Sequence, residues 1–232
     1  MTSQLNKIAD YWNQRSFGYS LDNQEELLHD QEKWIELINR YLKINKGMKV
    51  LDLGCGPGFF SVMLTNYGCQ VIGIDYSDKM LEEARNNARK FKANVEFQKM
   101  DVQDLAFQDE IFDLIITRNV TWNLEKPVQA YQEMVRVLKK QGHLLNIDGN
   151  HYYHYQDQDY SRAGHSDHQH MEGIDVSIID NIAKELKLSY VLRPQYDIEI
   201  LKEIGFQQVE SQIEKTKEGK ELIRQFLIHA IK

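Results

Sequence analysis

The stretch KVLDLGCGPGFF, from Lys49 to Phe60, decides the fold of this chain. A short, mostly apolar run that contains Asp52 is followed by three glycines, Gly54, Gly56 and Gly58, and then by two phenylalanines. This pattern predicts a buried strand, a turn of unusual backbone freedom and the start of a helix, because glycine takes positive φ without steric conflict. Open α/β sheets hold nucleotide-like ligands at such loops. A glycine-rich turn can also be free of any ligand, so the rest of the chain must decide.

The bulk properties of the chain exclude several classes of protein. It has 232 residues, of which 42% are hydrophobic and 27% are charged, as expected for one folded α/β domain with a small insertion. A net charge of -7 argues against a general nucleic-acid binder, which needs a basic face. Two cysteines, Cys55 and Cys69, indicate a reducing compartment rather than a disulfide framework. We find no membrane-spanning run and no signal-peptide core, so we expect a cytoplasmic protein without membrane or nucleic-acid partners.

The N-terminal region contains two features before the glycine loop. Residues 11–20, YWNQRSFGYS, are rich in aromatic side chains, which favours either a helix pinned to the body or a flap that closes over a ligand. Asp22 and Glu25 resemble a capping box, and apolar residues recur behind them at helical spacing. We therefore predict an amphipathic helix over residues 23–45 that ends at Gly47.

Strands and helices then alternate, which predicts a mainly parallel sheet with right-handed crossovers. The predicted strands are residues 49–53, 70–75, 94–101, 111–119 and 143–148, and the predicted helices are 58–67, one capped by Ser77, and 127–140. After a polar stretch and a short helix from Asp197, a brief turn joins two more strands, residues 206–213 and 222–231. Because that turn is too short for a parallel crossover, these strands should form an antiparallel hairpin at the end of the sheet.

Acidic residues follow two of these strands. Asp75 ends the second strand, about twenty residues after the glycine loop, where a carboxylate can accept both hydroxyls of a ribose. Asp101 ends the third strand at the same edge and could accept from an exocyclic purine amine. Asp52, just before the loop, would repel a pyrophosphate but attract an ammonium group. The three acids together favour S-adenosylmethionine over a dinucleotide.

Five segments carry a resemblance to a known family. VLDLGCGPG, VIGIDYS, MDVQDLAF, FDLIITRN and RVLKKQGHLLNID, in this order and spacing, resemble the class I S-adenosylmethionine-dependent methyltransferases, in particular the small-molecule branch that includes quinone-biosynthesis enzymes. The resemblance is strong over residues 45–148 and looser beyond. It implies a Rossmann-like three-layer α/β sandwich with a mainly parallel seven-stranded sheet and an antiparallel last strand. Gln98-Lys99-Met100 departs from the pattern, because relatives often have a glycine there.

The resemblance also implies roles for individual residues. Asp52 and the loop backbone would hold the methionine end, Asp75 the ribose, and Asp101 the adenine amine. The complete set of implied cofactor residues is Tyr11, Arg15, Tyr19, Asp52, Gly54, Cys55, Gly56, Asp75, Tyr76, Met80, Asp101, Val102, Thr117, Arg118 and Asn119. We divide the chain into an N-terminal helical cap (1–45), a cofactor-binding core (46–148), an acceptor lid (149–195) and a C-terminal helix with the closing hairpin (196–232).

The lid is rich in histidine and tyrosine, and three interpretations of it compete. The first is a polar loop with solvated histidines. The second makes His151 or His154 a residue that binds the acceptor or serves as its base. The third is a metal site in the HSDHQH segment, residues 165–170. We expect no metal, since no cysteine supports such a site. The expected acceptor residues are Trp122, Tyr152, Tyr155 and Arg193, although Trp122 could equally belong to the core and Arg193 to a structural ion pair.

These observations predict a methyltransferase of the EC 2.1.1 type. It would move a methyl group from S-adenosyl-L-methionine to an O, N or C nucleophile of a small molecule by in-line displacement, and release S-adenosyl-L-homocysteine. We expect a monomer or a homodimer. One alternative is a non-catalytic cofactor-binding sensor or partner protein. Another is a nicotinamide oxidoreductase, against which Asp52 argues.

Overall fold

A computed structural model describes residues 1–232 except 1–2, 163–169, 171–172 and 216–221. Its described residues form one sheet of seven strands in the order β3-β2-β1-β4-β5-β7-β6. The strands are β1 (Lys49–Leu53), β2 (Gln70–Asp75), β3 (Glu96–Lys99), β4 (Phe112–Arg118), β5 (Leu138–Gly149), β6 (Gln208–Lys215) and β7 (Ile223–Ile231). The helices are α1 (Gln4–His29), α2 (Gln31–Asn39), α3 (Phe59–Asn66), α4 (Asp78–Lys90), α5 (Pro127–Val137), α6 (Ser177–Ala183) and α7 (Gln195–Glu203).

The pairing of the strands confirms the predicted fold class. β1 pairs in parallel with β2 and β4, β2 with β3, and β4 with β5. β7 runs antiparallel to both of its neighbours, β5 and β6. β6 and β7 therefore form the antiparallel hairpin that the sequence predicted.

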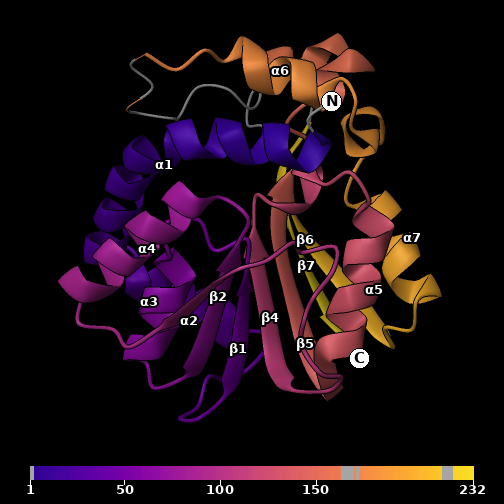
Figure 1. The fold of residues 1–232 in the computed structure, drawn as a ribbon. Coiled ribbons are helices and arrows are strands. Elements are labelled where there is room, and N and C mark those ends of the chain that lie inside the picture. The colour runs from indigo at the N-terminus through magenta and orange to yellow at the C-terminus, as the bar shows by residue number, and fades with distance from the viewer. Residues whose placement is uncertain (1–2, 163–169, 171–172, 216–221) are drawn as a thin grey trace.

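The two faces of the sheet pack against different helices, because neighbouring strand residues point to opposite sides. Leu51 and Ile115 face the core beneath α5 and α7, whereas Val50 and Ile116 face the core beneath α2 and α3. Figure 1 shows these layers, with α2, α3 and α4 on one side of the sheet and α5 and α7 on the other. The carboxyl ends of the parallel strands are left uncovered by this packing.

The predicted helix over residues 23–45 is wrong in both of its limits. α1 runs without interruption from Gln4 to His29, so Asp22 lies inside a helix and caps nothing. The observed cap is Ser3, whose Oγ accepts a hydrogen bond from Asn6 N at 3.3 Å. Gly47 is not a helix terminus either, since α2 ends at Asn39; Gly47 turns the chain into β1 with a φ of 82°.

The helix predicted over residues 127–140 ends earlier than expected. α5 stops at Val137, and β5 begins at the next residue. Gln141, within β5, takes the left-handed conformation with a φ of 62°. Within the part of the chain that the structure describes, none of the helices is long and apolar enough to cross a membrane.

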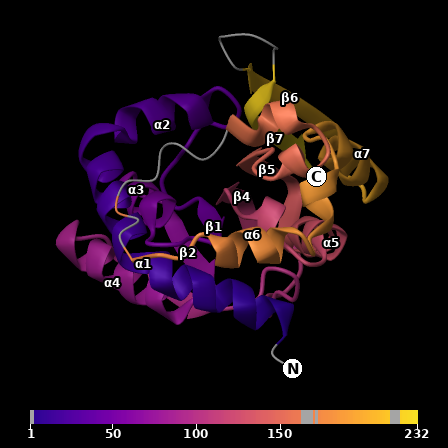
Figure 2. The same cartoon turned by 90° about the horizontal axis from the view of Figure 1, so that it is seen from above.

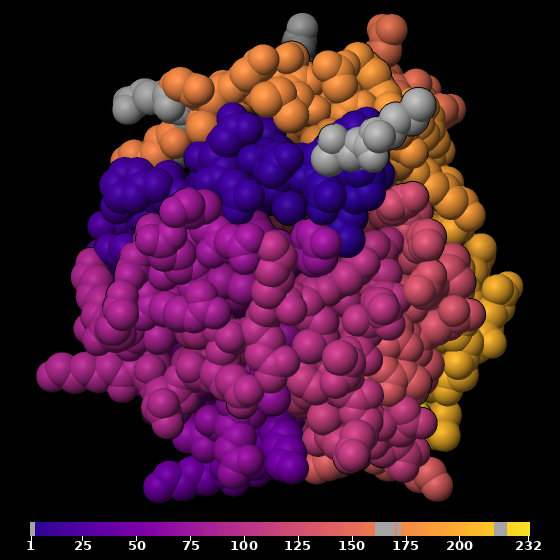
Figure 3. Space-filling view, viewed as in Figure 1, coloured from indigo at the N-terminus to yellow at the C-terminus, as the bar shows by residue number. Residues whose placement is uncertain are grey.

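α1 lies across the carboxyl ends of the strands and under the lid. Figures 1 and 2 show it crossing this end of the molecule beside α4, with α6 above it. In Figure 3 its surface forms a band between the body and the lid. Ile8 and Tyr11 of α1 pack against Ile179, Ile182 and Tyr152 of the lid in one apolar cluster. The N-terminal helix is therefore shared between the core and the lid.

Candidate functional site at the carboxyl edge of the sheet

The loop after β1 depends on its glycines. Gly54, Gly56 and Gly58 have φ values of 68°, 51° and 87°, a region that other residues adopt only with strain. A Cβ atom added to Gly54 would lie 2.4 Å from Cγ2 of Val120, a distance shorter than atoms tolerate. The backbone here therefore comes closer to the loop after β4 than any side chain would permit.

Asp52 lies beneath this loop and is almost fully buried. Its Oδ2 accepts hydrogen bonds from Ser61 N at 2.8 Å and from Ser61 Oγ at 2.6 Å. Burial raises the pKa of Asp52 to about 6, against the opposing effects of Ser61 and Arg118. Asp52 thus joins the end of β1 to the first turns of α3, and it does not line the cavity described below.

Asp75, at the end of β2, faces the same loop. Its Oδ2 accepts from Gly56 N at 2.9 Å, and its Oδ1 accepts from Ser77 N at 2.8 Å. Burial raises the pKa of Asp75, although the backbone donors at Ser77 and Gly56 oppose that rise. Ser77 caps α4, as predicted, and its hydroxyl also donates to Asn13 Oδ1 of α1 at 2.7 Å.

Asp101 supplies an acid beside the third strand. Its Oδ1 accepts hydrogen bonds from Gln103 N at 2.9 Å and Gln103 Nε2 at 3.1 Å. Gln103 Oε1 in turn accepts from Lys126 N at 2.6 Å, next to the start of α5. These bonds fix the loop after β3 against the segment that follows β4.

These three loops and the loop after β4 surround a cavity with an empty volume of about 810 Å³, part of it open to solvent. Leu5, Ile8 and Trp12 of α1 close it from above. The sequence-predicted cofactor residues that line it are Tyr19, Gly54, Gly56, Asp75, Tyr76, Met80, Asp101, Val102, Arg118 and Asn119. Acidic groups, apolar side chains and glycine backbone from four loops are therefore brought together in one space.

Five other predicted cofactor residues are buried away from this lining. Besides Asp52, Tyr11 packs in the cluster between α1 and the lid, and Arg15 Nη1 donates to His170 O at 3.3 Å. Cys55 is buried, and burial raises the pKa of its thiol well above the usual value. Thr117 has no exposed surface. None of these five residues is among those that line the cavity.

Sequence reasoning missed several residues of the lining. The missed residues are Leu5, Ile8, Ala9, Trp12, Ser77, Gln103, Val120, Asn123, Leu124 and Glu125. Recognising residues 4–12 as a helix would have revealed the first four, because Leu5, Ile8, Ala9 and Trp12 follow an i, i+3, i+4, i+7 pattern.

Arg118 connects the cavity to α1. It forms a two-pronged ion pair with Glu26 at 2.8 and 2.7 Å, and its guanidinium lies 5.2 Å from the ring centre of Trp34 and 4.9 Å from that of Phe59. Burial lowers the pKa of Arg118, but Glu26 outweighs it, and the net shift is upward. Arg118 is therefore held as a fixed cation at the end of β4.

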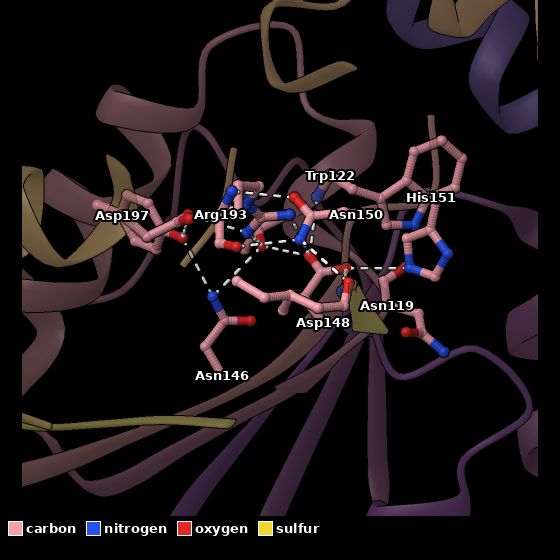
Figure 4. A network of polar contacts seen from close by, with 12 residues as sticks. Asn119, Trp122, Asn146, Asp148, Asn150, His151, Arg193 and Asp197 are labelled. Carbon is pink, nitrogen blue, oxygen red and sulfur yellow. Dashed lines mark hydrogen bonds and ion pairs between the residues drawn. The ribbon is translucent and has the colours of Figure 1, made fainter. Parts of the chain in front are cut away.

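The structure corrects the expectation for Arg193. Its side chain has no exposed surface, and Nε, Nη1 and Nη2 all bond to protein atoms of Asp197, Asp148 and Thr121. A guanidinium that is fully buried and bound to three protein residues is not exposed to an acceptor molecule. The structure therefore supports the structural ion pair, which the sequence had left open, rather than acceptor binding (Figure 4).

His151 lies at the partly exposed edge of the same network. Its Nε2 is 3.2 Å from Asp148 Oδ1, and its side chain is 24% exposed. The ring lies 5.3 Å from that of Trp122, and Trp122 Nε1 donates to the backbone oxygen of Asn119 at 3.0 Å. Since Asn119 lines the cavity, Figure 4 places His151 close to that lining.

The other candidate acceptor residues form an aromatic stack. Trp122 and Tyr152 are both buried, with ring centres 5.3 Å apart, and Tyr155 stacks on Tyr152 at 5.9 Å. His154 lies 4.4 Å from Tyr155 and 5.7 Å from Tyr152. Of the two histidines, His151 is the one that lies beside Asp148, at the carboxyl end of β5.

The metal hypothesis concerned residues 165–170. His165 and His168 lie outside the described residues, and His170 is described. Among the residues that the structure describes, no group of three or more histidine, cysteine or acidic side chains could hold a metal ion.

Comparisons with known proteins agree with this geometry. A family profile described as a methyltransferase domain matches residues 44–203. A ubiquinone biosynthesis O-methyltransferase from Coxiella burnetii is 30% identical over 100 residues, which cover 43% of this chain and 43% of that protein. The match therefore spans less than half of that relative's length.

Two solved structures share the fold. A SAM-dependent methyltransferase from Aquifex aeolicus aligns with a TM-score of 0.60 and 22% identity, over 89% of this chain and 91% of that one. A phosphoethanolamine N-methyltransferase from Haemonchus contortus, in complex with S-adenosyl-L-methionine, aligns with a TM-score of 0.69 and 16% identity, over 100% of this chain and 60% of that one. With the family profile covering more than half of the sequence, the chain belongs to the methyltransferase domain family.

Proposed function

We propose that this protein is an S-adenosyl-L-methionine-dependent methyltransferase (EC 2.1.1 type) that acts on a small-molecule nucleophile. One observation carries the proposal: the glycine loop, Asp75 and Asp101 come from three successive strand ends and line one cavity. This is the arrangement that a nucleoside with an amino-acid end requires. The net charge of -7 supports a small-molecule acceptor over a nucleic acid.

The residues of the cavity fit the cofactor. Gly54 and Gly56 offer backbone that a ligand can approach closely, and the Asp75 carboxylate is positioned to accept from hydroxyl groups. Met80 and Trp12 supply apolar surface for a purine ring. When bound, S-adenosyl-L-methionine supplies a methyl group that its sulfonium already activates.

The chain's own part in the reaction is positioning, exclusion of water and movement of a proton. α1 covers one side of the cavity and so limits the access of solvent, which strengthens the electrostatic contacts on that side. Arg118 and Asn119 lie at the end of β4 and line the cavity. His151, held by Asp148, is placed to take a proton from an acceptor that must lose one.

Isothermal titration with S-adenosyl-L-homocysteine tests the proposal. We expect the wild type to bind at micromolar concentrations and Asp75→Ala to lose about 2 kcal/mol of binding free energy or more, roughly thirtyfold in affinity. Asp78→Ala is the matched control, because Asp78 is three residues away and its exposed carboxylate pairs with Lys99 outside the cavity. Absence of binding to the wild type, or equal effects of the two substitutions, would overturn the proposal.

A screen with tritiated methyl donor then identifies the acceptor class. Phenols, amines and carbon nucleophiles would be offered at equal concentration, with His151→Gln beside the wild type. Transfer to phenols that falls on the order of 10²-fold in the variant supports a base at this position. Binding of S-adenosyl-L-homocysteine without transfer to any acceptor class would instead favour a cofactor-binding sensor.

A further inference from the structure

The two ends of the lid meet at one buried polar network beside the carboxyl end of β5. We propose that Arg193, from the far end of the lid, is a positioning residue that orients His151 through Asp148. This inference rests on the proposed function only where it makes His151 a proton acceptor. The contacts among Arg193, Asp148 and His151 do not depend on that function, and Figure 4 shows them.

Arg193 is fixed on all sides. Its Nη1 lies 2.9 Å from Asp148 Oδ2, its Nε lies 2.8 Å from Asp197 Oδ2, and its Nη2 donates to Asp197 Oδ1 at 2.9 Å and to Thr121 Oγ1 at 2.6 Å. The guanidinium is a rigid planar fork, so this set of bonds defines its position and its orientation together. A lysine would keep the charge and lose the fork.

Asp148 divides its two oxygens between two sets of partners. Oδ2 accepts from Arg193, from Trp122 N at 2.9 Å and from the hydroxyl of Thr121. Oδ1 accepts from Gly149 N at 2.8 Å and from His151 Nε2 at 3.2 Å. Burial would raise the pKa of Asp148, but Arg193 and His151 hold it well below its usual range. With Oδ2 anchored, the carboxylate cannot rotate, and Oδ1 stays aimed at the imidazole.

His151 is the member of the network that reaches solvent. Asp148 and Arg193 have side chains with no exposure, whereas that of His151 is 24% exposed. A hydrogen bond from Nε2–H to Asp148 leaves the lone pair of Nδ1 free to accept a proton. The two carboxylates and one guanidinium carry one net negative charge, which a proton on His151 would balance. The network is therefore arranged to receive a proton at its open edge.

The side chain of Asn150 joins the two ends of the lid directly, because it bonds to the backbone of Arg193. Asn150 Oδ1 accepts from Arg193 N at 2.9 Å, and Asn150 Nδ2 donates to Arg193 O at 2.9 Å. Asn150 precedes His151 in the chain. These two bonds therefore hold Arg193 next to the residue that precedes His151.

Nuclear magnetic resonance of the full-length, ¹⁵N-histidine-labelled protein tests this without any ligand. His151→Gln assigns the ring signals. We expect the Hε2 proton of wild-type His151 to be protected from exchange with water, and its exchange rate to rise at least tenfold in Arg193→Lys. Arg136→Lys is the matched control, because Arg136 is held by Glu133 at 2.8 and 2.7 Å and lies far from His151 in the fold. It should leave the Hε2 signal unchanged.

A second variant covers the case in which Arg193→Lys does not fold. Thr121→Val keeps the size of the side chain and removes the hydroxyl that bridges Arg193 and Asp148. We expect faster Hε2 exchange in this folded protein too. Unchanged exchange in a folded variant of either kind overturns the inference. Since no cofactor is added, failure of S-adenosyl-L-homocysteine to bind the wild type would contradict only the proposed function.

Discussion

Gly54 shows at the scale of one residue why the loop after β1 tolerates no side chain. Gly54→Ala must adopt left-handed backbone, and its Cβ would also meet Val120 at 2.4 Å. Gly47→Ala has the same backbone problem, at a φ of 82°, with no atom within 4 Å of its Cβ. We expect Gly54→Ala to be less stable than Gly47→Ala by about 1–3 kcal/mol, the typical effect of overpacking.

Urea unfolding of both variants measures that difference. Adding Val120→Ala to Gly54→Ala should recover most of it, because the crowding atoms are then absent. Equal losses for the two alanine variants would show that backbone strain alone makes glycine necessary at this turn.

The raised pKa of Asp52 predicts how the stability of the folded protein changes with pH. The folded-state pKa of about 6 lies above the usual 3.8, so the native state binds this proton more tightly than the unfolded chain does. Protonated Asp52 therefore stabilises the folded state at low pH, and this stabilisation is lost as the pH rises from about 4 to 6. By linkage this amounts to about 3 kcal/mol at pH 7.

Asp52→Asn should thus be more stable than the wild type at pH 7.5, by up to ~3 kcal/mol, and nearly equal to it at pH 4. Both bonds from Ser61 go to one oxygen, which the amide retains. Urea unfolding at the two pH values gives the comparison. A variant that is destabilised equally at both would contradict the assignment of a raised pKa to Asp52.

At the scale of secondary structure, α1 gives the clearest test, because it closes the cavity. Leu5, Ile8 and Trp12 would contact a bound ligand from above. We expect S-adenosyl-L-homocysteine to slow amide hydrogen exchange in residues 4–19 of α1 by a larger factor than in α7, which lies away from the cavity. Hydrogen-exchange mass spectrometry measures both segments in one experiment. Equal protection, or protection of α7 alone, would show that α1 does not cover the ligand.

The same helix shows where sequence reasoning fails. The strands around Gly54 and Asp75 were predicted well, since apolar runs and glycine turns are local patterns. α1 was divided wrongly, because Asp22 and Glu25 satisfy the local capping pattern although the chain stays helical through them. The neighbouring Ser20 and Gln24 bond to Asn87 of α4. Arg15 and Arg193 were assigned to ligands because a sequence does not show which way a long side chain turns. The positions of the strands along the chain follow from local sequence patterns. The burial of these two arginines depends on segments that are distant in the sequence.

At the scale of the whole molecule, acid stability should reflect Asp148. Its pKa in the folded state is far below its usual value, so the unfolded chain binds the proton more readily as pH falls. The stabilisation is present above about pH 4 and is lost below it. We expect the free energy of unfolding to fall less between pH 5 and pH 3 in Asp148→Asn than in the wild type.

Urea unfolding at pH 5 and pH 3 provides this measurement. Asp113→Asn serves as the control. The pKa of Asp113 is also lowered, because Lys139 and Lys49 outweigh the effect of burial. Its side chain is 35% exposed, so the variant should show a smaller difference. An identical acid-induced loss in the wild type and in Asp148→Asn would mean that other carboxylates govern unfolding.

α1 contacts two parts of the molecule, since one side of it closes the cavity and another packs against Ile179 and Ile182 of the lid. Binding free energies measured on its two sides are then not independent. A ligand in the cavity that fixes the position of α1 changes the affinity for a second ligand that contacts the lid. The second ligand changes the affinity for the first by the same factor. The order in which cofactor and acceptor arrive would alter the rates of assembly, but the stability of the ternary complex would be the same by either route.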